Sequence, residues 1–144
     1  MVEVDELDLK ILKMLQEDGR LSFTGIAKKL RMSESTIRKR VQALQKKKVI
    51  KRFTVEVNPS KIGINTVAIV GVDVDSTELL EAAQKLCEMK EIRSVATSTG
   101  DHMIMTEVWT TGERELMKII SEKIGKIDGV KRTCPAIILE KLKG

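Results

Sequence analysis

The spacing of apolar residues in this sequence of 144 residues first changes near residue 49. Before that point, apolar side chains recur every three or four positions, as they do on the buried face of a helix. Asp5, Ser22 and Ser33 stand just ahead of such runs and are typical helix N-caps. The pattern predicts three short helices separated by tight turns, at residues 5–17, 23–30 and 34–47. This arrangement is typical of a helix-turn-helix unit.

The residues that follow predict a strand and then a hinge. Phe53, Val55 and Val57 alternate with polar residues, which is the periodicity of a strand. A strand at residues 49–57 would come directly behind the third helix, in the position of a wing. Asn58-Pro59 ends it. We therefore predict a winged helix-turn-helix domain at residues 1–58 and a hinge at residues 59–63.

The second part of the chain, residues 64–144, alternates strand and helix patterns. Strands are predicted at residues 66–74, 92–99, 103–110 and 130–142, and helices at residues 78–89 and 113–126. The order β-α-β-β-α-β predicts a ferredoxin-like α+β sandwich.

Two helices cover only one face of a four-stranded sheet. Residues 67–70 and 136–139 are nevertheless apolar at consecutive positions, so both faces of their strands carry apolar side chains. A second copy of the same sheet is the simplest cover for the open face. The sequence therefore predicts a homodimer formed through residues 64–144.

Positive charge is concentrated in the first part of the chain. The net charge is +5 overall, but residues 20–52 hold twelve Lys and Arg against one acid, Glu34. A charged run is usually a solvated face, yet this excess is larger than solubility requires. It favours a polyanionic partner such as double-stranded DNA.

The third predicted helix carries the sharpest pattern. Ile37, Val41 and Leu44 fall on one side of it as a core stripe, and the opposite side is polar and cationic. A recognition helix presents such hydroxyls, amides and cations to the major groove, although the same face would also suit plain solvation. The predicted DNA-binding residues are Ser22, Ser33, Ser35, Thr36, Arg38, Lys39, Gln42 and Lys46. Arg40 lies near the core flank, where it is predicted to pair with an acid of the first helix such as Asp8.

Several classes of protein are disfavoured. The chain has one His, no Tyr, and neither a P-loop nor a dinucleotide fingerprint, so we predict that it is not an enzyme and has no cofactor. Cys87 and Cys134 lack a CxxC spacing and are predicted to be reduced, buried thiols, not a disulfide or metal site. No run of 18 apolar residues predicts a membrane span, and the acidic start, with Glu3 and Asp5, does not suit a signal peptide. We therefore expect a cytoplasmic protein that does not bind a membrane.

The chain resembles the Lrp/AsnC, or feast/famine, family of transcription regulators over almost its whole length. The resemblance in the first part rests on Leu7-Asp8, Ile11-Leu12, Gly19-Arg20, Ser22, Ile26-Ala27, Leu30, Ser33, Thr36-Ile37, Arg40-Val41, Leu44 and Val49-Ile50. Asn58-Pro59 to Gly63 is similar to the family's linker, and residues 95–108, with Gly100-Asp101 between two strands, look like its effector-sensing domain. The sequence departs from the family at His102 and Met103, where many members have a second acid.

The resemblance implies a DNA-binding regulator whose dimers assemble further, often to octamers, and which binds an amino acid near the loop after the second sheet strand. Residues in that loop suit such a ligand independently, because glycine allows close approach and Asp101 offers a partner for an ammonium group. The candidate effector-binding residues are Ser98, Thr99, Gly100, Asp101, His102 and Thr133. Taken alone, Gly100-Asp101 also fits an ordinary β-turn.

The sequence thus predicts a sequence-specific transcription regulator whose assembly and DNA binding respond to a small amino acid. An architectural DNA-binding protein without an effector is the alternative. A footprint separates the two, because a regulator protects defined operators and an architectural protein coats DNA without preference.

Overall fold

The computed structural model describes residues 4–144 and divides into two units, Met1–Glu56 and Val57–Gly144. Glu3, one of the acidic residues that do not suit a signal peptide, lies outside the described residues. Among the described residues, no helix combines the length and the apolar character needed to cross a membrane.

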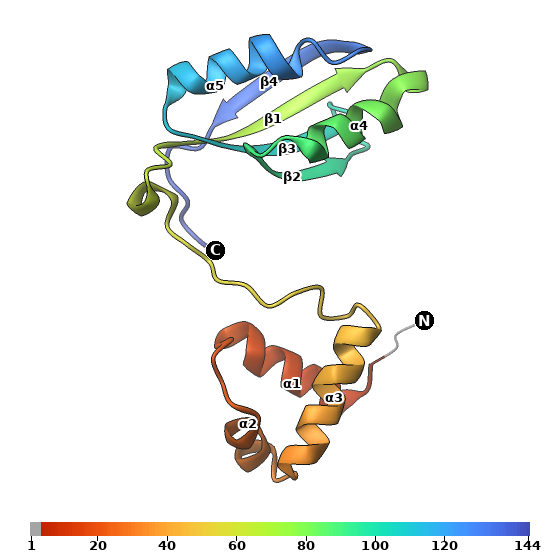
Figure 1. Cartoon of the computed structure of the whole chain (residues 1–144), viewed down its shortest axis with the longest axis vertical. Coiled ribbons are helices and arrows are strands. Elements are labelled where there is room, and N and C mark those ends of the chain that lie inside the picture. The colour runs from red at the N-terminus through yellow and green to blue at the C-terminus, as the bar shows by residue number, and fades with distance from the viewer. Residues whose placement is uncertain (1–3) are drawn as a thin grey trace. The chain divides into compact units, whose positions relative to one another are not determined.

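The first unit contains the three predicted helices, α1 (Glu6–Glu17), α2 (Phe23–Leu30) and α3 (Glu34–Lys46) (Figure 1). Each begins after the predicted cap: the side chains of Asp5, Ser22 and Ser33 accept hydrogen bonds from the backbone N–H groups of Asp8, Gly25 and Thr36. Burial of the apolar stripes then packs the helices around one small core. Its buried residues are Ile11, Ile26, Ala27, Ile37 and Val41.

The turn between α2 and α3 contains no glycine. Arg31 ends α2 in the left-handed conformation, with φ of 55°, and Met32 donates a backbone hydrogen bond to the Ala27 carbonyl. This geometry is the usual C-cap of a helix, although glycine adopts it at lower cost. The tight helix-turn-helix therefore forms with an arginine at the position that glycine would favour.

The predicted wing strand is wrong for this structure. Residues 51–58 run without strand pairing (Figure 1). Phe53 and Val55 are 50% and 78% exposed. A strand requires a neighbour to pair its backbone N–H and C=O groups. The rest of the described part of this unit is helical and supplies none, so the alternating pattern stays unpaired.

The second unit has the predicted β-α-β-β-α-β order, which confirms the ferredoxin-like fold. A 3-10 turn, Pro59–Ile62, occupies the predicted hinge and ends at Gly63, whose φ of 86° suits glycine. The strands form one antiparallel sheet in the order β2-β3-β1-β4. They are β1 (Thr66–Val74), β2 (Ile92–Thr97), β3 (Ile104–Thr110) and β4 (Val130–Ile137).

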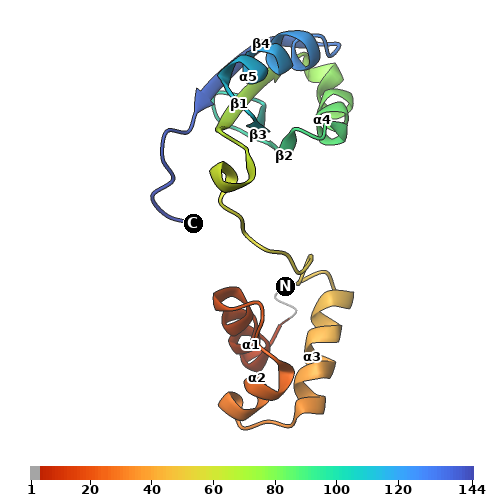
Figure 2. The ribbon, with the colours of Figure 1, turned by 60° about the vertical axis from the view of Figure 1, so that its left-hand side comes forward.

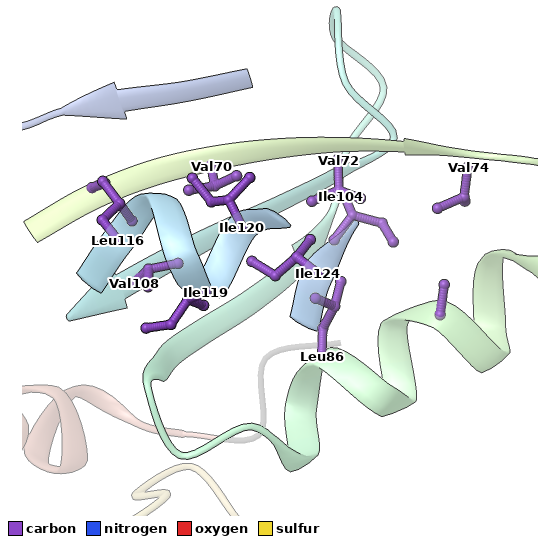
Figure 3. Packing of buried hydrophobic residues seen from close by; sticks show 12 residues of the cluster. Val70, Val72, Val74, Leu86, Ile104, Val108, Leu116, Ile119, Ile120 and Ile124 are labelled. Carbon is purple, nitrogen blue, oxygen red and sulfur yellow. The ribbon is translucent and has the colours of Figure 1, made fainter. Parts of the chain in front are cut away.

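Both helices of this unit, α4 (Leu79–Glu88) and α5 (Glu113–Ile119), lie on the same face of the sheet (Figures 1 and 2). The core fills the space between the two layers, as Figure 3 shows. Alternate residues of β1 and β3 supply one side of the core, and the apolar stripes of the helices supply the other. Its fully buried side chains include Val70, Val72, Leu86, Ile104, Val108, Leu116 and Ile124.

Three predictions about this unit need correction. The second helix changes at Ile120 to a π-helical turn, Ile120–Ile124, in which the Gly125 N–H donates to the Ile120 carbonyl five residues back. β4 ends at Ile137, which pairs with Ala68 of β1, so the strand is five residues shorter at this end than predicted. The cysteines are free, as predicted, but Cys87 is exposed and Cys134 only half-buried.

The face of the sheet opposite the helices carries an apolar patch. Strand alternation places on it every second residue of β1 and the residues that pair with them. We call this surface the open face; its apolar residues include Val67, Ile69, Met105, Trp109 and Ala136. No element of the described unit covers it, as the sequence led us to expect.

Candidate functional site

The polar side of α3 is exposed along its length. Ile37, Val41 and Leu44 are buried on the opposite side, so packing of the core fixes which side chains face outward. Five of the predicted DNA-binding residues lie on this polar side and are exposed: Ser35, Arg38, Lys39, Gln42 and Lys46.

A cluster of hydroxyl groups marks the N-terminus of α3. Ser33 Oγ accepts from the Thr36 N–H at 3.2 Å, and it lies 2.7 Å from Thr36 Oγ1 and 3.2 Å from Ser35 Oγ. Backbone N–H groups and the helix dipole make this end attractive to a phosphate. Ser22 instead caps α2, accepting from the Gly25 N–H at 3.0 Å. It remains exposed, so its hydroxyl is still accessible to a ligand.

Arg38 is held by two neighbours that the sequence reasoning missed. Its Nη2 donates to the carboxylate of Glu34, one turn earlier on α3. Its guanidinium carbon lies 5.6 Å from the centroid of the Phe23 ring, at the start of α2. The spacing of four residues between Glu34 and Arg38 signalled the ion pair. The contact with Phe23 depends on how α2 packs against α3, which a single sequence does not reveal.

Arg40 has the structural role predicted for it. Its Nη1 donates to the carboxylates of Asp5 and Asp8, the latter at 3.3 Å, and so connects α3 to the start of α1. The hydrogen bond from Arg40 lowers the pKa of the Asp5 carboxyl, and the Asp8 N–H adds to the effect. Arg40 therefore connects two helices of this unit.

The predicted effector loop is an exposed turn between β2 and β3. The Ser98 N–H donates to the Met103 carbonyl at 2.9 Å, and the Gly100 N–H donates to Ser98 Oγ at 3.1 Å. Ser98, Thr99, Gly100 and Asp101 are all exposed. The structure thus brings four predicted residues together in one short turn, with the Asp101 carboxylate free to meet a cation.

His102 turns away from that loop onto the open face of the sheet. Its imidazole occupies the space where a side chain at Gly71 would project, and its Nδ1 lies 3.2 Å from Asp73 Oδ2. Asp73 also accepts from the Met103 N–H at 3.3 Å and lies 3.5 Å from Arg132 Nε. Partial burial opposes ionisation of Asp73, but the hydrogen bonds from His102 and Met103 leave its pKa below the ordinary value.

Thr133 is not brought to the effector loop. It pairs with Val72, whose side chain is buried on the helix-covered side of the sheet, so Thr133 projects to that side. His102 and Asp73 lie on the other side. The sequence reasoning missed Asp73 and Arg132, because their proximity to the loop depends on the strand order and register.

Comparisons with known proteins agree with both halves of this arrangement. A model of the AsnC-type helix-turn-helix domain matches residues 4–45, and one of the Lrp/AsnC ligand binding domain matches residues 67–144. The HTH-type transcriptional regulator LrpA of Pyrococcus horikoshii is 51% identical over 140 residues, covering 97% of this chain and 99% of that protein.

Solved structures share this fold over nearly the whole chain. AsnC of E. coli superposes with a TM-score of 0.88 at 25% identity, covering 99% of this chain and 97% of that one. A transcriptional regulator of Neisseria meningitidis, solved as a complex with L-Met, superposes with a TM-score of 0.89 at 20% identity, covering 98% and 93%. The latter shows the shared fold alone.

The fold and the exposed cationic helix define a helix-turn-helix transcription regulator with a separate ligand-binding domain. The chain belongs to the Lrp/AsnC family, as the resemblance predicted. Its relatives are DNA-binding regulators and not enzymes.

Proposed function

We propose that this regulator recognises a defined DNA sequence and that α3 is its recognition helix. The observation that carries the proposal is the exposed polar side of α3, fixed outward by the burial of Ile37, Val41 and Leu44. Residues 20–52, which include α3, hold twelve Lys and Arg against one acid. Such a charge excess attracts DNA without regard to sequence, and the helix side chains then supply the discrimination.

The exposed residues divide into two proposed roles. Arg38, Lys39 and Gln42 have the donor and acceptor groups that read base edges in the major groove. Hydroxyls and the remaining cations suit the phosphates, which fix the position of a protein on the duplex. The proposed phosphate contacts are Ser22, Ser33, Ser35, Thr36 and Lys46.

The second part of the proposal is an amino-acid effector at residues 98–102. The turn is exposed, its glycine permits close approach, and Asp101 offers an anion to an ammonium group. The match to a ligand-binding domain supports a small ligand, and the Neisseria relative was solved with L-Met. Thr133 is not part of this proposed site, because its side chain projects to the other side of the sheet.

The third part is a homodimer formed through the open face. The open face carries partly exposed apolar side chains that no element of the described unit covers, and a second copy would cover them symmetrically. Assembly beyond the dimer, up to an octamer, is proposed from the family alone. An effector that favours one assembly state would alter DNA binding, because assembly sets the spacing of paired recognition helices.

The alternative, an architectural DNA-binding protein without effector, predicts a different binding experiment. Wild type is used to select duplexes from a random pool, and affinities are then measured on a selected and a random duplex. A regulator with the proposed roles loses about 1–3 kcal/mol on the selected duplex when Arg38 or Gln42 becomes Ala. Lys47→Ala is the matched control: it weakens both duplexes alike and lowers the salt slope by about one. Equal binding of all duplexes by wild type would favour the architectural protein.

A further inference from the structure

The contacts of Arg38 support an inference that goes beyond the proposed reading of DNA by α3. This inference rests on that proposed function. Glu34 is the one acid among residues 20–52, and it stands in the first turn of the helix that approaches a polyanion. A carboxylate there repels phosphate and lowers affinity for every DNA sequence. An acid at this position therefore needs a role that offsets its repulsion of phosphate.

The geometry of Arg38 supplies that role. Glu34 accepts from Arg38 Nη2, while the Phe23 ring lies 5.6 Å from the guanidinium carbon. One contact fixes an edge of the planar group and the other fixes a face, so together they restrict its rotation. Without them, a long arginine side chain on a helix surface samples many rotamers, and ordering it on binding costs free energy.

The same two contacts leave Arg38 able to bind a base. A guanidinium has five N–H donors, and among the described residues Arg38 uses only Nη2 in a hydrogen bond. The side chain of Arg38 remains 54% exposed. A bidentate contact with guanine O6 and N7 needs two donors on one edge, which the remaining N–H groups provide.

We propose that Glu34 is a specificity-determining positioning residue: it holds Arg38, with Phe23 behind it, in the orientation that reads one guanine. Glu34 then lowers affinity for all DNA through its charge and raises the preference for one base pair through Arg38. These two effects have opposite signs, and that opposition makes the proposal testable.

The test compares variants of the full-length chain on a duplex selected from a random pool and on a random duplex of the same length. Glu34→Ala removes both the charge and the contact, while Glu34→Gln removes the charge but keeps an oxygen that accepts from Arg38. Both variants are expected to bind the random duplex more tightly than wild type. Only Glu34→Ala should lose the preference at one G·C pair, by roughly five- to a hundredfold.

Two further variants identify the mechanism. Arg38→Ala should lose preference at the same base pair, and the double variant Glu34→Ala/Arg38→Ala should lose no more than Arg38→Ala alone, because both act through one contact. Phe23→Leu, which keeps an apolar side chain, should reduce the preference partially. Glu6→Ala is the matched control, since it removes an acid paired with Lys10 on α1 at the same spacing and should change both duplexes by one factor.

Each outcome decides the question. Additive losses from Glu34→Ala and Arg38→Ala overturn the proposal, as does an equal gain of Glu34→Ala on both duplexes. Loss of preference at a base pair other than the one affected by Arg38→Ala would show that Glu34 contacts a base itself, and would overturn the proposal. If wild type selects no sequence, the proposed DNA reading fails and this proposal fails with it. If wild type selects a sequence and Glu34→Ala keeps the preference, only this proposal fails.

Discussion

Arg40, in the middle of α3, donates a hydrogen bond to the carboxylate of Asp5, the residue that caps α1. The ion pair spans 35 positions of sequence and connects the recognition helix to the first helix. Asp8 also accepts from Arg40, so two acids at the start of α1 hold the same guanidinium of α3.

This pair predicts a loss of stability in acid. In the folded chain, the hydrogen bond from Arg40 lowers the pKa of the Asp5 carboxyl below its ordinary value of 3.8. The stabilisation that the charged carboxyl provides is therefore complete above that ordinary pKa, and it is lost as the pH falls through the lower pKa of the folded chain. Asp5→Asn keeps the N-cap but removes the charge. Urea unfolding followed by circular dichroism should show a weaker dependence on pH for Asp5→Asn than for wild type, between about pH 5 and 2. Glu6→Gln is the control, and equal pH dependence of Asp5→Asn and wild type would contradict the role of the pair.

Close packing of His102 on Gly71 predicts an effect that depends on both residues. A Cβ at Gly71 would overlap the imidazole ring, so Gly71→Ala should destabilise the chain by about 1–3 kcal/mol. His102→Ala opens that space, and the double variant should recover most of the loss. Urea unfolding measures the loss and its recovery, from the midpoints of variants whose unfolding free energy has the same dependence on urea concentration. If the destabilisation of the double variant equals the sum of those of the two single variants, the imidazole does not lie against Gly71 in solution.

The open face predicts that one charge will disrupt assembly. Ile69 lies on it, and Ile69→Glu would place a carboxylate in an apolar contact between two sheets. Light scattering at micromolar concentration should find wild type at least dimeric and Ile69→Glu monomeric. Leu80→Glu is the matched control, because Leu80 is 81% exposed on the helix side and should tolerate the change. A monomeric wild type, or a dimeric Ile69→Glu, would contradict the proposed interface.

The effector loop predicts that Asp101 is needed for the ligand and not for the fold. A thermal-shift screen of amino acids identifies the ligand, and calorimetry then compares the variants. Asp101→Ala should weaken binding by about 1.5–3 kcal/mol, the contribution of a hydrogen bond to a charged group. Asp128→Ala, an exposed turn acid elsewhere in the unit, should bind as wild type does. Unchanged affinity of Asp101→Ala would remove this carboxylate from the site.

The sequence predicts those parts of the structure that depend on local chemistry. Caps at Asp5, Ser22 and Ser33 set the helix starts, and alternation within residues 66–74 sets β1, because both follow from neighbouring residues. Phe53 and Val55 also alternate but form no strand, since pairing needs a partner that sequence periodicity does not guarantee.

The candidate sites follow the same rule. The exposed side of α3 is predictable from its buried stripe, but the contact of Arg38 with Phe23 needs the packing of α2 on α3. Likewise, the turn at Gly100 can be predicted from its own residues. The approach of His102 to Gly71 and Asp73 depends on how β1 and β3 pair.

The most direct test of the central claim is a competition titration of the full-length wild-type chain at physiological salt. A labelled duplex selected from a random pool competes with an unlabelled random duplex of equal length. We expect a preference of at least about a thousandfold for the selected duplex. Equal competition by the two duplexes, with the same dependence on salt, would show that this chain binds DNA through charge alone and would contradict sequence-specific recognition.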